Sequence, residues 1–364
     1  MENRYSKFLS IVAGLFLAGF SFFILKELQS ILLPFFVALI ISFLFAPFYE
    51  FMKKKKIPAF VAIIIIVLII LIIANLSSVF VYTSIVAFKN DVPKYVLKGQ
   101  ELINSSLKYF DNLGIPQSYK DNMNIANFLN GEKIAGIITD LISGIAGIFT
   151  NFILILIYVI FLLTEFGSIR RRILKAFSAE KSRKITEALT DILYDVRKYI
   201  VGKTLINFAH GVIIMVVFWM FGLDFAILWG LLTFILAYIP NIGAFIATIL
   251  PFLTALLQYD NFITPIILLV IMAVVGSVMG NVVEPKILGD KLNLSPILLL
   301  FSLLFWGYVW GIVGMILSVP VMSMIKIVLS KFESTRPISI MMEYETGPDK
   351  GERQMEIDFK KKDS

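Results

Sequence analysis

Long apolar runs, separated by short polar blocks, dominate the chain. A membrane-spanning helix needs about 20 consecutive apolar residues, and six runs are close to that length. These predicted spans cover residues 8–25, 31–52, 57–82, 144–166, 199–221 and 262–283. The first run is followed by a polar segment and then by the second run, without a small-residue cleavage site. We therefore interpret it as a retained helix rather than a signal peptide.

Two further apolar stretches, 225–258 and 297–330, are 34 residues long each. A straight helix of that length would measure roughly 50 Å, well beyond a hydrocarbon core of about 30 Å. Each stretch is also interrupted near its middle by helix-breaking residues, at Pro240 to Gly243 and at Trp310 to Gly314. We predict that each forms a re-entrant hairpin of two half-length helices. The alternative is one long, kinked span per stretch.

The basic residues predict the orientation of these segments. Lysine and arginine cluster before the first span, after the second span, in 167–198 and after residue 325, whereas the links around Asp224 and Asp260 contain none. Because basic loops stay on the cytoplasmic side, we expect both termini to be cytoplasmic. Span 199–221 with its hairpin and span 262–283 with its hairpin then form two units of opposite topology. Inverted repeats with broken helices are typical of secondary transporters.

The expected fold is an all-α polytopic membrane protein, with about six full spans plus two re-entrant helical hairpins arranged as an inverted repeat. An amphipathic extracytoplasmic helical segment at 83–143 is expected to lie on the membrane or against another subunit. The organisation we expect has five parts: an N-terminal scaffold (1–82), that amphipathic segment, a fourth span with a basic cytoplasmic helix (144–198), a transport core (199–330) and a disordered cytoplasmic tail (331–364).

Composition supports lipid as the natural surroundings of this chain. It is 58% hydrophobic and only 16% charged, against about 25% charged residues in soluble domains. The net charge of +7 lies in short blocks rather than in a stripe with interleaved aromatics, so we expect no nucleic-acid partner. The absence of cysteine and the single histidine argue against a metal site, and Gly202-Lys203-Thr204 lacks the remainder of a phosphate-binding loop. We expect no cofactor and no catalytic residues.

The breaks in the two hairpins are the strongest candidates for a solute site. A half-helix that starts inside the membrane presents free backbone N–H groups, which can bind an anion or a polar oxygen. The glycines have an alternative role in close helix packing. The candidate substrate-binding residues are Tyr238, Pro240, Asn241, Gly243, Trp310, Gly311 and Gly314.

Three polar residues in the predicted spans are candidates for ion coupling. Glu284 ends the sixth span, where a carboxylate can carry a proton or bind a cation, or simply pair with a neighbouring base. His210 lies halfway along span 199–221, with Asn207 one turn before it. A proton relay and a hydrogen-bonded packing role are both open for this histidine. Lys203, near the inner end of the same helix, is expected to extend toward the interface.

Several motifs, in order, resemble those of the autoinducer-2 exporter family, also called PerM-like permeases. The resemblance covers residues 8 to 331, and it implies a multi-pass protein of the bacterial cytoplasmic membrane that forms a homo-oligomer. Some members are described as sodium or lithium/proton antiporters. Ser295 stands where the family often has histidine. The motifs are Leu33-Pro34-Phe35 with Pro47 and Lys56-Ile57-Pro58, Tyr199 to Lys203, Ile239 to Gly243 with Pro251, and Asn281 to Gly289 with Pro296, Gly311 to Gly314 and Pro320.

Together these features predict a secondary transporter that exports a small polar solute, similar to autoinducer-2, by using a proton or sodium gradient. Its partners would be the lipid bilayer, the solute and the coupling ion. A sodium or lithium/proton antiporter is the first alternative. The second is a membrane scaffold that moves no solute and acts through 83–143.

Overall fold

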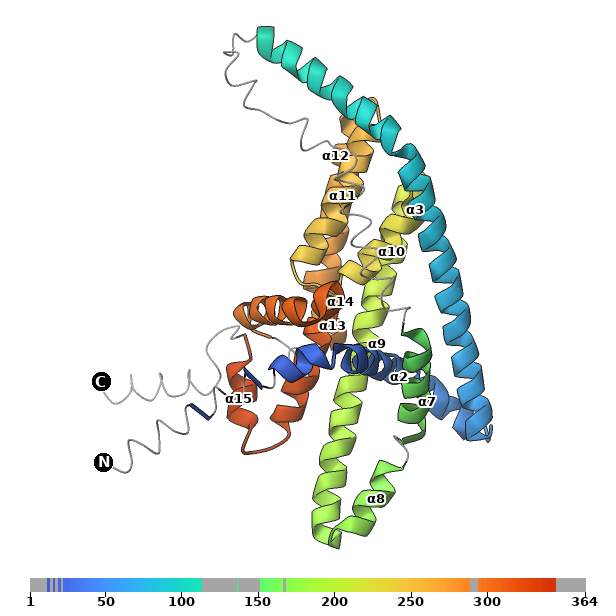
Figure 1. Ribbon diagram of the computed structural model, residues 1–364, viewed down its shortest axis with the longest axis vertical. Coiled ribbons are helices and arrows are strands. Elements are labelled where there is room, and N and C mark those ends of the chain that lie inside the picture. Colours follow the sequence, from blue (N-terminus) through green and yellow to red (C-terminus); the bar gives the residue numbers. More distant parts are fainter. Residues whose placement is uncertain are drawn as a thin grey trace, which may run out of the picture.

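The computed structural model describes residues 22–112, 151–165, 168–288 and 294–344, with isolated positions 12, 13, 16, 19, 20 and 136. Its named elements are all helical (Figure 1). About half of the predicted first span lies outside the described residues, and so does 113–143 of the predicted amphipathic segment apart from residue 136. The helices are α2 (Gln29–Lys54), α3 (Ala59–Asn112), α7 (Phe152–Glu165), α8 (Ile169–Ala176), α9 (Ala179–Phe221), α10 (Ala226–Leu236), α11 (Ile242–Gln258), α12 (Ile263–Val278), the π-helical segment η1 (Met279–Val283), α13 (Glu284–Leu288), α14 (Pro296–Ser330) and α15 (Arg336–Met341).

Two helices run on beyond the predicted span boundaries. The third span and the amphipathic helix after it are one curved helix, α3, along one side of the molecule (Figure 1). The basic cytoplasmic segment and the fifth span likewise form one helix, α9. Neither junction contains a glycine or proline that would stop the helix. A change from polar to apolar residues alters the surroundings of a helix without ending it.

The far part of α3 contacts the protein's own core. The Tyr95 hydroxyl donates to an Asp224 carboxylate oxygen at 2.7 Å, and Lys98 Nζ lies 2.6 Å from an Asp260 oxygen. Phe88 packs edge-on against Phe225, with ring centroids 5.4 Å apart. The extension of α3 therefore contacts both of the links that lack basic residues, around Asp224 and Asp260.

Helices α10 and α11 form a hairpin whose two ends meet. At the open end, Gln258 Nε2 donates to the Gly222 carbonyl at 2.7 Å and its Oε1 accepts from the Asp224 N–H at 2.8 Å. At the closed end the chain turns through Pro240 and Asn241. Gly243 is needed there, because a Cβ at this position would overlap the Leu236 carbonyl oxygen. The break lies where the sequence predicts it.

Helix α14 is also interrupted at its predicted break, where Trp310 and Gly311 have non-helical backbone angles. Gly311 adopts φ +64°, ψ −147°, a region that is essentially restricted to glycine. Ser302 Oγ donates to the Ser318 carbonyl at 3.2 Å, although residues 16 apart in a straight helix would be about 24 Å apart. The two arms of α14 therefore lie side by side, and a Cβ at Gly314 would overlap the Trp306 carbonyl oxygen.

The first part of the C-terminal tail is ordered, where the sequence predicts disorder from Lys331 onward. Helix α15 packs on α14, and Ser339 is buried. Leu294 and Glu343 form an antiparallel bridge, and the Ser295 N–H donates to the Met342 carbonyl at 2.9 Å. Ser295 also caps α14, because its Oγ accepts from the Leu298 N–H. Polar composition concealed these local contacts.

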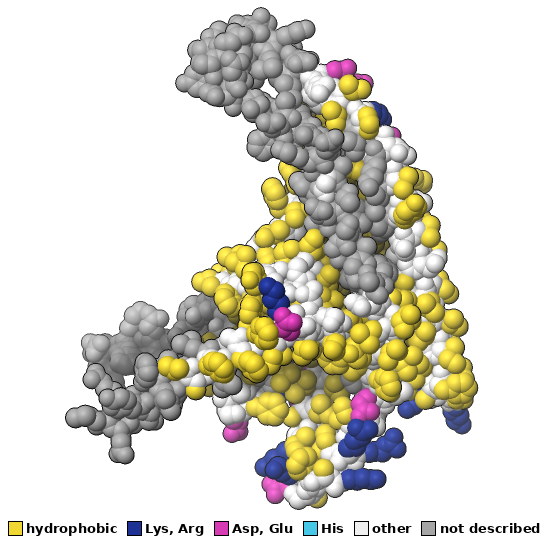
Figure 2. Space-filling model, viewed as in Figure 1, with side chains coloured by type: hydrophobic (Ala, Val, Ile, Leu, Met, Phe, Trp, Pro, Cys, Tyr) yellow, Lys and Arg dark blue, Asp and Glu magenta, His cyan; other side chains and the backbone are white. Residues whose placement is uncertain are grey.

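The outer surface of the helices is mostly apolar (Figure 2), while charged side chains gather around α8 and the start of α9. A water-soluble protein rarely exposes so much contiguous apolar surface. Within the described residues, five helices are long and apolar enough to cross a membrane: α2, Ala59–Phe88 of α3, α9, Ile263–Leu288 and α14 by its total length. The chain is therefore a multi-pass membrane protein.

Candidate functional site

A cavity of about 320 Å³ lies between α9, the closed end of the α10–α11 hairpin and the helix formed by α12, η1 and α13. Leu299 and Val319, from the two arms of α14, complete its wall. The structure thereby brings together six candidates from distant parts of the sequence. These are Asn207, His210, Tyr238, Pro240, Asn241 and Glu284.

The contribution of α9 is a polar stripe in the apolar later part of the helix. Lys203, Asn207 and His210 are spaced by four and three residues, so they lie on one face, and all three line the cavity. Asn207 is only 2% exposed, and its Nδ2 has no hydrogen-bond partner within the described protein. Buried amide groups normally have a partner. The Asn207 amide is thus a buried polar group whose donor capacity the described protein does not satisfy.

Lys203 and Glu284 form an ion pair at the wall of the cavity. The ammonium lies 2.7 Å from each carboxylate oxygen, with the Lys203 side chain 10% exposed and the Glu284 side chain 31% exposed. The pair fits the interpretation of Glu284 as the partner of a neighbouring base. Charges removed from water are tolerated when they are paired in this way. Lys203 is the functional candidate that sequence reasoning missed, although its spacing to Asn207 and His210 was a usable signal.

A π-helical segment directs Glu284 into this pairing. The Glu284 N–H donates to the Met279 carbonyl, five residues earlier. Pro285 follows, and its ring would clash with a carbonyl four residues before it in a regular α-helix. The wider π turn relieves that clash and rotates the helix face that follows. Short π segments inside helices are frequent at functional sites, and this one supplies Met279 and Gly280 to the cavity as well.

At the closed end of the first hairpin, three of the first four backbone N–H groups of α11 are already engaged. The N–H groups of Ile242, Gly243 and Phe245 donate to the carbonyls of Pro240, Ile239 and Asn241. Asn241 has φ +57°, a conformation that asparagine tolerates better than most residues. The Tyr238 hydroxyl lies 2.7 Å from Thr204 Oγ1, which itself donates to the Ile200 carbonyl.

The remaining four candidates are outside the cavity. Gly243 and Gly314 are buried where their hairpins close, as the packing interpretation expects. Trp310 is 2% exposed, donates from Nε1 to the Leu25 carbonyl at 3.1 Å, and packs against Trp306 with ring centroids 4.6 Å apart. Gly311 supplies the reversal of α14. The sequence marks both breaks as candidates for a solute site, but only the first break lines this cavity.

A smaller cavity of about 50 Å³ continues from the first one, past His210. Ala237, Ala244, Gly276 and His210 line both spaces. The hydroxyls beyond them, on Thr233 and Thr248, donate to carbonyls of their own helices at 2.8 Å. The small cavity is consequently narrow and mainly apolar, and it offers a polar molecule fewer partners than the larger one.

The sequence of this chain is similar to those of known transport proteins. Residues 9–334 match the family described as "AI-2E family transporter". The chain is 27% identical over 319 residues to a Borreliella burgdorferi protein named "Putative transport protein", covering 87% of this chain and 86% of that protein. It is also 27% identical over 314 residues to "AI-2 transport protein TqsA" of Escherichia coli, covering 86% and 89%. This chain belongs to the AI-2E transporter family.

Proposed function

We propose that this membrane transporter is a secondary transporter that exports a small polar solute, and that the 320 Å³ cavity is where the solute binds. The observation that carries the proposal is the group of Asn207, Lys203 and Glu284 facing one space between apolar helices. Small-molecule sites are concave, have volumes of about 300–1,000 Å³ and carry a few convergent polar groups. The cavity meets all three conditions.

The side chains of the cavity suggest how a solute would be held. The free Asn207 amide would donate to a solute oxygen, while the exposed part of the Glu284 carboxylate would accept from a hydroxyl. Each such contact replaces a hydrogen bond to water that the solute loses on entry. The neutral total of the Lys203–Glu284 pair favours an uncharged, hydroxylated solute. The name of the Escherichia coli relative makes AI-2 the first solute to test.

The two hairpins would have different tasks in transport. In the orientation given by the basic blocks, both are re-entrant, and the first enters from the extracytoplasmic side. Movement of its closed end, which carries Tyr238, Pro240 and Asn241, would open the cavity toward one side of the membrane. The second hairpin, anchored through Trp310, would serve as the fixed support. Alternating access of this kind requires no cofactor.

Sodium or lithium/proton antiport is the second candidate, and Glu284 is the observation that favours it. A carboxylate that exchanges its ammonium partner for a cation or a proton can couple two ion movements. The partial exposure of Glu284 beside a buried Lys203 gives such an exchange a route. In this mechanism Lys203 would be released from the pair each time an ion binds.

Everted membrane vesicles with a pH-sensitive dye inside distinguish these functions. Sodium, lithium and AI-2 are added in turn, and AI-2 accumulation is measured directly. We expect accumulation of AI-2 accompanied by a pH change that vesicles without the protein do not show. A response to sodium or lithium alone would replace the exporter by the antiporter. Silence toward all three would contradict both proposals and favour the scaffold alternative.

Two matched variants connect the result to the cavity. Glu284→Gln removes a carboxylate whose partner lines the cavity, whereas Glu165→Gln removes a carboxylate that pairs with Arg172 outside it. We expect transport to be lost in the first variant and retained in the second. Equal activity in both variants would contradict the assignment of this cavity as the solute site.

A further inference from the structure

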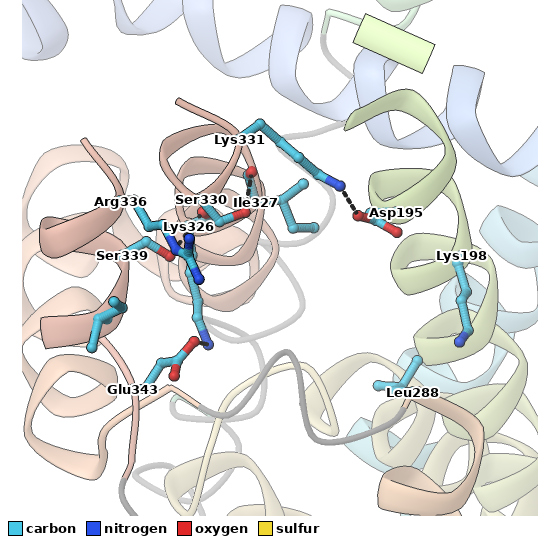
Figure 3. A pocket seen from close by; sticks show the side chains of 11 residues that line it. Asp195, Lys198, Leu288, Lys326, Ile327, Ser330, Lys331, Arg336, Ser339 and Glu343 are labelled. Carbon is cyan, nitrogen blue, oxygen red and sulfur yellow. Dashed lines mark hydrogen bonds and ion pairs between the residues drawn. The ribbon is translucent and has the colours of Figure 1, made fainter. Parts of the chain in front are cut away.

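A second and larger cavity, of about 560 Å³, lies between α9 on one side and α14 with α15 on the other (Figure 3). It is separate from the proposed solute cavity. Glu284, at the first residue of α13, lines the solute cavity, whereas Leu288, at its last residue, lines the second one. Helix α13 thus stands between the two spaces.

The lining of this second cavity is predominantly cationic. Lys198, Lys326, Lys331 and Arg336 line it, against the carboxylates of Asp195 and Glu343. Lys326 Nζ lies 3.2 Å from a Glu343 oxygen, and Lys331 Nζ lies 2.9 Å from an Asp195 oxygen. Both acidic side chains are therefore already engaged. The lining retains two positive charges beyond those that its own carboxylates balance.

Two of the four cations make no ion pair within the described part of the chain. Lys198 extends from α9, and Arg336 from the start of α15 on the opposite wall (Figure 3). The serine hydroxyls of the lining are occupied, because Ser330 and Ser339 donate to the Ile327 and Lys326 carbonyls. The donors that remain for a ligand are the cationic groups.

Like charges that face a shared cavity repel one another, and Lys198 and Arg336, which are both exposed, remain accessible to an anion from solution. An anion between them removes the repulsion and accepts charge-assisted hydrogen bonds. Guanidinium offers paired N–H groups that match the oxygens of a phosphate, and ammonium supplies a point charge. The cavity is large enough for a phosphate group together with a small organic substituent.

We propose that this cavity is a binding site for a phosphate group, held between Lys198 and Arg336 and neighboured by Lys326 and Lys331. The group has two possible sources, a soluble phosphate compound and the headgroup of an anionic lipid, since both present the same chemistry. The site does not depend on the proposed solute cavity or on transport, and its occupancy can be measured in protein that moves no solute.

The test uses the full-length protein in neutral detergent, with thermal unfolding followed against inorganic phosphate and pyrophosphate at constant ionic strength. A ligand that binds the native state raises the unfolding midpoint once its concentration approaches the dissociation constant, and the midpoint then rises with the logarithm of the concentration. We expect such a rise, and we expect Lys198→Gln with Arg336→Gln to weaken the apparent affinity at least tenfold. The matched control is Arg171→Gln with Lys175→Gln, which removes two exposed cations of α8 outside the cavity.

A variant with the opposite expected effect serves as a further control, because misfolding could weaken phosphate binding but would not tighten it. Glu343→Gln removes one carboxylate from the lining and should tighten phosphate binding several-fold.

Experiments in nanodiscs distinguish the two sources of the phosphate group. Saturable phosphate binding in neutral lipid that disappears in phosphatidylglycerol identifies a lipid headgroup, and binding in both lipids identifies a soluble ligand. No saturable binding in detergent or nanodiscs, or equal binding by the wild type and the double variant, would overturn the proposal.

Discussion

The two interrupted apolar stretches share one backbone design but present opposite surroundings at their closed ends. In both, a non-helical turn is followed by a glycine whose absent side chain lets a carbonyl oxygen approach. In the first, Asn241 is exposed and lines a polar cavity. In the second, Trp310 is 2% exposed and packs against the rings of Phe36 and Trp306, while Gly311 at the reversal itself is exposed. The same turn therefore borders a polar cavity in one place and follows a buried, hydrogen-bonded tryptophan in the other.

This difference shows which part of a hairpin the local sequence determines. Proline and glycine determine where the chain reverses. The neighbours on other helices determine what the turn does. Lys203, Asn207 and Glu284 surround the first turn, whereas Leu25 and Phe36 from the N-terminal part cover the second. A break in a membrane helix is therefore evidence for a reversal, and only its surroundings identify a site.

The largest expected effect comes from filling the glycine positions that both hairpins need. Gly243→Val and Gly314→Val each force a side chain into a backbone carbonyl, and overpacking of this kind costs about 1–3 kcal/mol or more. We expect a much lower thermal unfolding midpoint in detergent for both variants. Gly19→Ala is the control, since no atom lies near its added Cβ. Normal stability of either valine variant would contradict the common design.

The second prediction concerns the Lys203–Glu284 ion pair, which lines the cavity at the closed end of the first hairpin. Glu284→Gln leaves the ammonium of Lys203 buried without its carboxylate. Loss of one partner from a buried pair costs about 3–5 kcal/mol, and we expect about half of that here because Glu284 is partly exposed. Adding Lys203→Gln should restore part of the lost stability. Strictly additive effects in this double-mutant cycle would show that the pair does not couple.

A third prediction separates the site from the anchor. Trp310→Phe removes the hydrogen bond to the Leu25 carbonyl, and we expect it to lower the free energy of unfolding by about 1 kcal/mol while transport continues. Asn241→Gly should do the reverse, with stability retained because glycine tolerates the positive φ of this position, and transport lost because the side chain lines the cavity. Parallel measurements of thermal unfolding and vesicle transport check both. If the two variants change stability and transport in the same way, the proposed difference between the two hairpins is wrong.

The smallest effect is expected at the exposed pair between α3 and the core. The hydrogen bond from Lys98 holds the pKa of Asp260 below its ordinary value, and Asp260 raises the pKa of Lys98. Stability from the depressed carboxyl is present above the usual aspartate pKa and lost as the pH falls through its folded value. Stability from the raised ammonium is lost only at strongly alkaline pH.

Asp260→Asn should therefore change the unfolding midpoint slightly at neutral pH and low salt, and not at all in 1 M salt, because salt screens exposed charges. The midpoint of the variant should also respond less to acid than that of the wild type. A large effect that persists in high salt would show that this contact supports the fold more strongly than an exposed pair can.

The sequence was informative about helices, their breaks and six of the residues that line the cavity. Apolar length and the residues at Pro240 and Gly311 carry that information locally. The sequence was less informative about which residues of distant helices contact one another. The pairing of Lys203 with Glu284 joins positions 81 residues apart, and the cover over Trp310 comes from the other end of the chain. Periodicity along one helix cannot reveal which distant helix supplies the opposite wall.

The central claim is that Asn241, at the closed end of the first hairpin, lines a polar cavity, whereas Val309 and Trp310, next to the closed end of the second, are buried in protein. The chain contains no cysteine, so single cysteines at these ends can be labelled without background. A small, membrane-impermeant thiol reagent is applied to vesicles carrying Asn241→Cys or Val309→Cys, with labelling after unfolding as the reference. We predict rapid labelling of Asn241→Cys and none of folded Val309→Cys. Equal labelling of the two, or an unreactive Asn241→Cys, would contradict the account.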